Sequence, residues 1–249
     1  TGGLDDIQLR LLEERLRYLR ELEERRAAII ASITEQNKMT PELLDAVMHA
    51  EDKTRLEDLY LPYKQKRRTK AQIAIEAGLA PLADGLLENP ELNPETEAAK
   101  YLREAFTTAD GNNPGVADTK AALDGARAIL MEQFAEDAEL IGRLREKLWR
   151  EAEIHAQVMA GQETAGEKFK DYFDHREPVR TMPSHRALAV LRGRNENILQ
   201  AALKYQLDDT PITEQSEYEQ AIAKQFNIAD QGRAADKWLR DTVRLTWRA

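Results

Sequence analysis

Cysteine is absent from this chain of 249 residues, which excludes disulfide bonds, thiolate zinc sites and cysteine nucleophiles. The chain also lacks any run of the roughly 18 consecutive apolar residues that a membrane-spanning helix needs. Its first residues do not form the basic and apolar regions of a secretory signal. We therefore expect a cytoplasmic protein with no membrane partner. Because position 1 is not Met and the opening resembles a helix cap, we expect a segment of a longer protein.

Positive charge is the minority sign, with 36 Lys and Arg residues against 45 Asp and Glu residues and a formal net charge of −9. Such a chain repels a nucleic-acid backbone on average, so any binding of nucleic acid must depend on local basic patches. Hydrophobic residues make up 42% of the chain, which is enough to fold. The length allows one large domain or two smaller ones.

Helical periodicity is the strongest pattern in the sequence. From residue 4 to residue 33, apolar residues recur at helical spacing while Arg and Glu fill the other positions, which predicts a long amphipathic helix. Its leucines are expected to pack within the chain rather than in an intermolecular coiled coil. Thr40, Pro41 and Glu42 provide an N-cap, a first-turn proline and an acidic first turn. A second helix is therefore predicted to continue to about residue 57.

Further helices are predicted between the Gly, Pro and Asn breaks along the rest of the chain. They span residues 71–78, 79–87, 96–106, 118–134, 137–155, 184–191, 197–205, 213–226 and 234–247, with Asp118, Asp137 and Ser184 as N-caps. The turn-rich segment 109–115 is a candidate boundary between two helical parts. No convincing alternation of β-branched residues is found, so strand content should be minimal. The predicted fold class is all-α, an elongated multi-helix scaffold.

No arrangement of residues predicts catalysis. The four histidines are scattered, and the group of Asp171, Asp174 and His175 is better explained as a polar turn than as a metal site. The segment 161–168 superficially resembles a phosphate-binding loop, but Glu167 stands where the Lys should follow Gly166 and no Ser or Thr comes after it. We expect a protein that is not an enzyme and holds no cofactor or metal.

The first feature that suggests a binding site is a basic cluster in this acidic chain. It consists of Lys64, Lys66, Arg67, Arg68 and Lys70, with no acidic residue between them. Such a cluster can contact phosphates or an acidic protein surface. A charge run is also commonly a solvated loop, and the residues alone favour neither interpretation.

A second basic region runs from residue 176 to residue 204, with six Lys or Arg residues against two acidic ones. Arg186, Arg192 and Arg194 are its candidate nucleic-acid contacts. Arginine also packs well and pairs with buried carboxylates, so structural ion pairing is the favoured interpretation for these three.

The segment Arg55-Leu-Glu-Asp-Leu-Tyr-Leu-Pro-Tyr-Lys-Gln-Lys-Arg-Arg-Thr-Lys70 resembles a signature of the Tex family of bacterial transcription accessory proteins. Residues 1–20, 183–196 and 229–239 resemble further family blocks in the same order. The resemblance implies a long helical scaffold with a helix-turn-helix-like subdomain. It also implies an RNase H-like domain without a working active site, a helix-hairpin-helix region and an OB-fold domain that supplies most nucleic-acid binding.

On this resemblance, residues 1–115 form the N-terminal helical domain, residues 116–175 the helix-turn-helix-like module, and residues 176–249 a scaffold that ends before the RNase H-like domain. The candidate recognition helix, residues 137–155, mixes basic with acidic side chains. It is therefore poorly suited to bind in the major groove of DNA. The implied function is a non-enzymatic scaffold of a factor that binds RNA or DNA mainly through domains absent here. RNA polymerase or its associated factors are further expected partners. The alternative is a protein interaction module that contacts an acidic partner of the transcription machinery.

Overall fold

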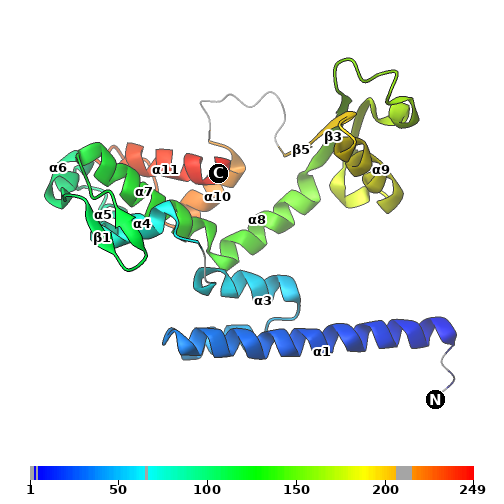
Figure 1. The fold of residues 1–249 in the computed structure, drawn as a ribbon, viewed down its shortest axis with the longest axis horizontal. Coiled ribbons are helices and arrows are strands. Elements are labelled where there is room, and N and C mark those ends of the chain that lie inside the picture. Colours follow the sequence, from blue (N-terminus) through cyan, green and yellow to red (C-terminus); the bar gives the residue numbers. More distant parts are fainter. Residues whose placement is uncertain (1–2, 4, 65–66, 206–214) are drawn as a thin grey trace. The chain divides into compact units, whose positions relative to one another are not determined.

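The computed structural model describes residues 3, 5–64, 67–205 and 215–249. It divides into two compact units (Figure 1). The larger unit consists of residues 1–141 and 223–249, and the smaller unit consists of residues 142–222. The boundary at residue 115, predicted from the turn-rich segment, and the boundary at residue 175, implied by the family resemblance, stay predictions.

The larger unit begins with α1 (Asp6–Glu35), which confirms the predicted amphipathic helix. The predicted helix from Thr40 is two helices, α2 (Pro41–Met48) and α3 (Lys53–Tyr60). Thr40 does cap α2, because its hydroxyl accepts the N–H of Leu43 at 3.2 Å. The core between these helices consists of Leu22, Ile29, Ile33, Val47, Ala50, Leu56 and Leu59.

Arg26 of α1 is buried within this core, with 6% of its surface exposed. Its guanidinium donates hydrogen bonds to the carbonyl oxygens of Val47 and Met48, and to that of Ala50 at 3.0 Å. These carbonyls lie at the end of α2 or just after it, where the regular hydrogen bonds of the helix run out. Arg26 therefore supplies donors that the helix end lacks.

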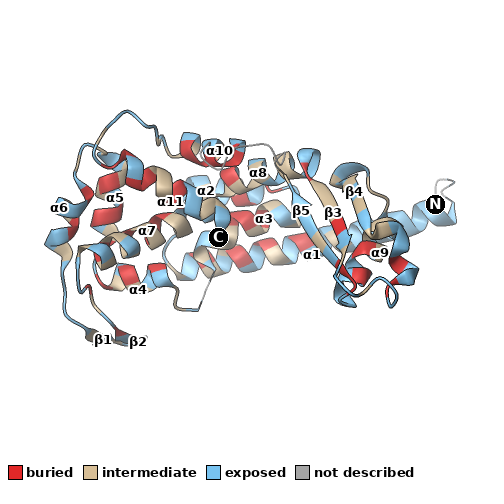
Figure 2. Ribbon diagram, turned by 90° about the horizontal axis from the view of Figure 1, so that it is seen from above, coloured by how far each residue is buried: buried red, intermediate tan, exposed pale blue. Residues whose placement is uncertain are grey.

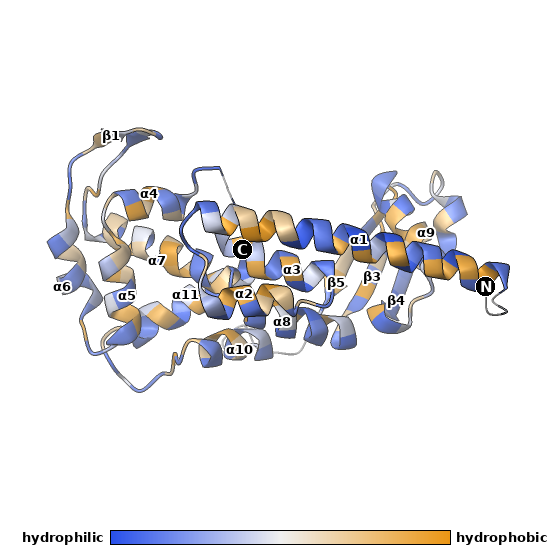
Figure 3. Cartoon of the chain, turned by 90° about the horizontal axis from the view of Figure 1, so that it is seen from below, coloured by the Kyte–Doolittle hydropathy of each residue, from blue (hydrophilic) through white to orange (hydrophobic). Residues whose placement is uncertain are grey.

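The N-terminal half of α1 is uncovered, contrary to the prediction that its leucines pack within the chain. Leu9, Leu12, Leu16 and Leu19 are 40–56% exposed. Figure 2 shows this end of the helix as exposed, and Figure 3 shows its apolar residues. The prediction was wrong because α2 and α3 pack against α1 only from Tyr18 onward, and all the α1 residues of the buried core lie at Leu22 or later.

After η1 (Leu61–Tyr63), the larger unit continues as a second group of helices around α7 (Thr119–Ala135). These are α4 (Lys70–Glu76), α5 (Ala80–Glu88), α6 (Pro94–Ala98) with η2 (Ala99–Tyr101), and α11 (Asp236–Arg248). All of them pack against α7, which places the C-terminal helix in the same unit as the N-terminal ones. Asp118 caps α7 as predicted.

The larger unit also contains a β-hairpin that the sequence did not predict. Strands β1 (Phe106–Thr108) and β2 (Gly111–Asn113) pair antiparallel, so the helix predicted over residues 96–106 ends at Tyr101. Gly111, the first residue of β2, follows the turn with φ +123°, a conformation that favours glycine.

The smaller unit holds an antiparallel sheet, which corrects the all-α prediction. It follows α8 (Ala138–Glu151) and has the strand order β4-β3-β5. The strands are β3 (Glu153–Val158), β4 (Asp174–Pro178) and β5 (Leu199–Lys204). The helix predicted over residues 137–155 was therefore wrong from residue 153 onward, where β3 begins. The helix predicted over residues 197–205 was wrong over β5. The protein is mostly helical, with two small sheets.

Two elements pack on this sheet, η3 (Glu167–Tyr172) and α9 (Ser184–Asn195). The smaller unit also contains η4 (Val179–Thr181) and the start of α10 (Glu217–Gln225). The N-cap of α9 is Pro183, not the predicted Ser184. Phe169, Ile198 and Leu199 form a small core. No helix in the described part of the chain is long and apolar enough to span a membrane.

Candidate nucleic-acid interface

The first basic cluster occupies the loop between η1 and α4. Lys64 and Arg67 are exposed in the loop, and Lys70 is the exposed first residue of α4. The predicted contact Lys66 lies outside the described residues. A cation at a helix N-terminus gains nothing from the helix dipole, so the charge of Lys70 is not used to stabilise α4.

Thr69 fixes the end of this loop. Its hydroxyl accepts the N–H of Gln72 at 3.0 Å, which caps α4, and donates to a carboxylate oxygen of Glu132 in α7 at 2.8 Å. The loop is therefore anchored to α7, and the side chain of Arg67 projects from a defined backbone position.

Arg68 has a structural role. Its Nε and Nη2 donate to the two carboxylate oxygens of Glu76 at 3.0 and 2.5 Å, and its Nη1 donates to the carbonyl oxygen of Asn112 at 2.9 Å. Only 22% of the Arg68 side chain and 12% of the Glu76 side chain are exposed. The bidentate pair raises the pKa of Arg68 and lowers the pKa of Glu76. Arg68 thus joins α4 to the β1–β2 hairpin, with its charge paired to Glu76. Its role as a nucleic-acid contact stays a prediction.

Lys64 and Arg67 also line an open cavity of about 500 Å³ in the larger unit. The lining residues are Gln36, Lys38, Pro62, Tyr63, Lys64, Arg67, Arg68, Thr69, Gln72, Asp110 and Glu132. Sequence reasoning missed Lys38, which follows α1 and is far from the basic run. No pattern in the sequence places it beside Lys64.

The second basic region lies in the smaller unit, and two of its three candidates are engaged in ion pairs. Arg186 lies 2.9 Å from Glu177, whose other oxygen contacts His175 Nε2 at 3.1 Å. The Glu177 side chain is 12% exposed, so this pair is partly shielded from water. The favoured structural interpretation agrees with this contact, and the phosphate role of Arg186 stays a prediction.

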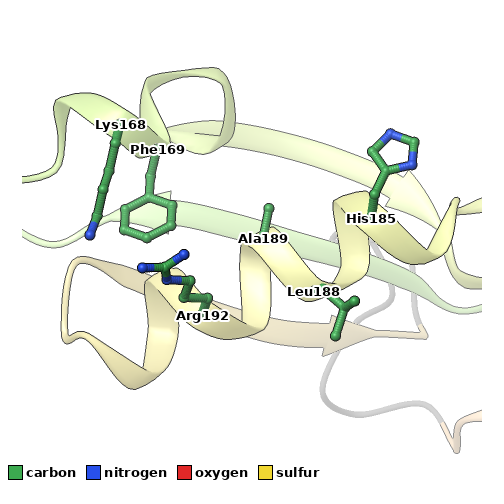
Figure 4. A pocket seen from close by; sticks show the side chains of 6 residues that line it. All are labelled: Lys168, Phe169, His185, Leu188, Ala189 and Arg192. Carbon is green, nitrogen blue, oxygen red and sulfur yellow. The ribbon is translucent and has the colours of Figure 1, made fainter.

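Arg192 has a similar position at the other end of α9. Its Nε lies 2.8 Å from Glu196, and Lys168 Nζ contacts the other oxygen of the same carboxylate at 2.6 Å. These hydrogen bonds, with that of Lys168 the stronger, lower the pKa of Glu196. Figure 4 shows Lys168 and Arg192 around the Phe169 ring, at a cavity of about 390 Å³. Arg194 is exposed and makes no ion pair within the described residues.

Gly166 and His175 have structural roles. Gly166 leaves no room for a side chain, because an added Cβ would lie 2.3 Å from Ile198 Cγ2. Gly166 therefore permits this turn to pack closely against Ile198 and Phe173. His175 bonds to Glu177, and the described residues contain no group of three His, Asp or Glu side chains that could hold a metal ion.

These features define a mostly helical scaffold with a basic loop beside a cavity. Residues 89–249 match the family model described as Tex central region-like, and residues 1–34 match the Tex-like protein N-terminal domain. The chain belongs to the Tex family, which confirms the resemblance found in the segment from Arg55 to Lys70.

Relatives from several bacteria match the whole chain. It is 66% identical to the transcriptional accessory protein Tex of Neisseria gonorrhoeae, 55% identical to protein YhgF of Escherichia coli, and 48% identical to protein tex of Bordetella pertussis. In each case the match covers 100% of this chain and 31% of the relative. The chain therefore spans about a third of the length of these relatives.

Proposed function

We propose that this chain is a non-enzymatic, cytoplasmic scaffold segment of a transcription accessory factor, and that it contacts nucleic acid through Lys64, Arg67 and Lys70. The observation that carries the proposal is the exposure of Lys64 and Arg67 on a loop that Thr69 and Arg68 anchor, and of Lys70 at the start of α4. Charge held at fixed positions suits the regular spacing of phosphates. One relative is itself named a transcriptional accessory protein.

The proposal does not depend on a recognition helix. The helix-turn-helix-like module over residues 116–175 would use α7 and α8, and α8 mixes Arg143, Arg145 and Arg150 with several glutamates. Contact with phosphates through the basic loop is independent of sequence, so the expected binding does not discriminate between base sequences.

Salt-dependent binding tests the proposal. Fluorescence anisotropy at low salt should detect binding of the 249-residue chain to labelled RNA or duplex DNA. The double variant Lys64→Ala/Arg67→Ala should weaken the binding. It should also reduce the salt dependence by about 0.7 to 0.9 in logarithmic slope for each phosphate that the variant no longer binds.

Lys100→Ala/Lys120→Ala is the matched control, because both lysines are exposed, lie outside the cavity lining and change the net charge by the same amount. No detectable binding, or an equal decrease in affinity in both double variants, would contradict the proposal.

A second function is favoured by α9. Leu188 and Leu191 are 66% and 46% exposed on this helix. They lie beside Arg192 and Lys168, two cations that share the single carboxylate of Glu196. Exposed apolar side chains next to positive charge suit an acidic protein partner better than a phosphate backbone. A factor associated with RNA polymerase is the expected class. The test is binding of the chain to RNA polymerase. Loss of this binding in Leu188→Gln/Leu191→Gln, with unchanged binding in Lys64→Ala/Arg67→Ala, would favour this function for the smaller unit.

A further inference from the structure

The cavity beside the basic loop has the composition of a nucleotide site. Its volume of about 500 Å³ is within the range of small-ligand sites. Its lining combines lysine and arginine side chains, one aromatic ring, two glutamines and two carboxylates. Cations suit a phosphate, an aromatic ring suits a base, and amides or carboxylates suit the polar edge of a base.

Two segments far apart in the sequence are held together to form it. Asn37 ends α1 with a left-handed φ of 55°, which turns the chain and places Lys38 at the cavity. Gln36 Nε2 donates to the carbonyl oxygen of Tyr63 at 2.9 Å and to that of Ser32 at 3.2 Å. This bond fixes η1 to the end of α1, so Lys38 and Lys64 line one cavity.

The charge of the lining fits one phosphodiester group. Arg68 is neutralised by Glu76, which leaves the exposed side chains of Lys38, Lys64 and Arg67. Asp110 and Glu132 are the two carboxylates of the lining. The three exposed cations can contact the oxygens of one phosphate group, whereas Glu132 already accepts a hydrogen bond from Thr69. A longer row of phosphates in the cavity would meet the two carboxylates.

Tyr63 provides a fixed aromatic surface. It is partly buried and packs against the core of α1, α2 and α3, so its ring is held by the fold before any ligand binds. A base that stacks on a preordered ring loses less entropy on binding than one that must order it.

We propose that this cavity takes one nucleotide of a single strand, with its phosphate at Lys38, Lys64 and Arg67 and its base beside Tyr63. The inference rests on the proposed function and adds to it a preference for single strands. In a duplex the bases are stacked inside the helix and cannot enter a cavity, whereas a single strand can turn one base outward. The exposed carboxylate of Asp110 offers an acceptor to base N–H groups.

The test compares two labelled RNA octamers, one of uridine and one abasic octamer with the same phosphates. The 249-residue chain should bind the uridine octamer about tenfold more tightly, because stacking depends on the base. Tyr63→Leu should remove this difference and Tyr63→Phe should keep it. Lys38→Ala should weaken both octamers and lower the salt slope by about 0.7. Tyr101→Leu and Lys100→Ala, which alter residues outside the lining, should leave the difference intact.

Equal binding of the two octamers by the unaltered chain would overturn the nucleotide site while leaving the charge-based proposed function standing. Absence of binding to either octamer would overturn both. Uridine monophosphate that competes with the octamer at equal concentration would show a mononucleotide site and overturn the single-strand preference. If Tyr63→Leu does not fold, photo-crosslinking with a 4-thiouridine octamer decides the matter. The proposal expects a crosslink on Tyr63, and crosslinks confined to residues outside the cavity would overturn it.

Discussion

At the scale of single residues, the cations of the basic loop differ in role. Arg68 is structural, whereas its neighbours are exposed to a ligand. Its guanidinium is fully engaged by Glu76 and Asn112, whereas Lys64 and Arg67 on the same loop are exposed. The run of basic residues predicted a positive loop. It did not indicate which cation is neutralised, because Asn112 lies 44 positions further along the chain and approaches Arg68 only after the hairpin folds.

The Arg68–Glu76 pair should make stability depend on pH. The pKa of Glu76 is lowered in the folded chain, first by the hydrogen bond from Arg68. The unfolded carboxylate therefore takes up its proton at a higher pH than the folded one. The stabilisation is fully present above the unfolded pKa and is lost as the pH falls through the folded pKa. Glu76→Gln should therefore lower the melting temperature at pH 7, and this difference should vanish in strongly acidic buffer.

Thermal unfolding followed by circular dichroism at a series of pH values measures this effect. Glu91→Gln is the control, because Glu91 is exposed and its side chain makes no ion pair within the described residues. A Glu76→Gln deficit that persists unchanged at acidic pH would show that poorer packing, and not the ion pair, explains it.

At the scale of elements, helices with local signals were predictable and strands that depend on distant partners were not. Asp118 and Thr40 mark their helix starts through side-chain caps within three residues. Strand β5 reads Leu-Gln-Ala-Ala-Leu-Lys, which has helix-forming residues and no β-branched side chain. It is a strand because it pairs with β3, about 45 residues earlier in the chain. Tertiary pairing overrides local propensity there.

Packing between helices can be tested with two helical glycines. Gly125 in α7 lies against α4, since an added Cβ would be 3.2 Å from Ala74 Cβ and 2.5 Å from the buried Leu79. Gly85 in α5 has no atom within 4 Å of that position. Gly85→Ala should stabilise the chain by about 0.5–1 kcal/mol through helix propensity. Gly125→Ala should lose that gain to overpacking of about 1–3 kcal/mol and be destabilising.

Chemical denaturation of the two variants gives the comparison. Both substitutions add the same methyl group to a helix, so only the surroundings differ. Equal stabilisation by both would show that Leu79 moves aside without cost and that α4 and α7 are not closely packed.

At the scale of the whole molecule, the N-terminal and C-terminal parts of the chain form one unit and the middle forms another. The turn-rich segment 109–115, for which a domain boundary stays a prediction, contains the turn and second strand of the hairpin in the larger unit. Composition marks turns, but it cannot show that α11 returns to pack on α7 more than 100 residues after α7 begins.

The return of α11 predicts where a substitution in it acts. Leu239 is 1% exposed and Leu245 is 39% exposed on the same helix. Leu239→Ala should cost about 2–5 kcal/mol by leaving a cavity in the core, and Leu245→Ala should cost much less. Hydrogen exchange measured by mass spectrometry should show faster exchange for Leu239→Ala in α4, α5 and α7, which share the core of the larger unit. Exchange in β3 and β4 should stay as in the unaltered chain, because the sheet has its own core. Faster exchange in β3 and β4 by the same factor would mean that the chain unfolds as a single cooperative body, and the division into two units would then have no energetic counterpart.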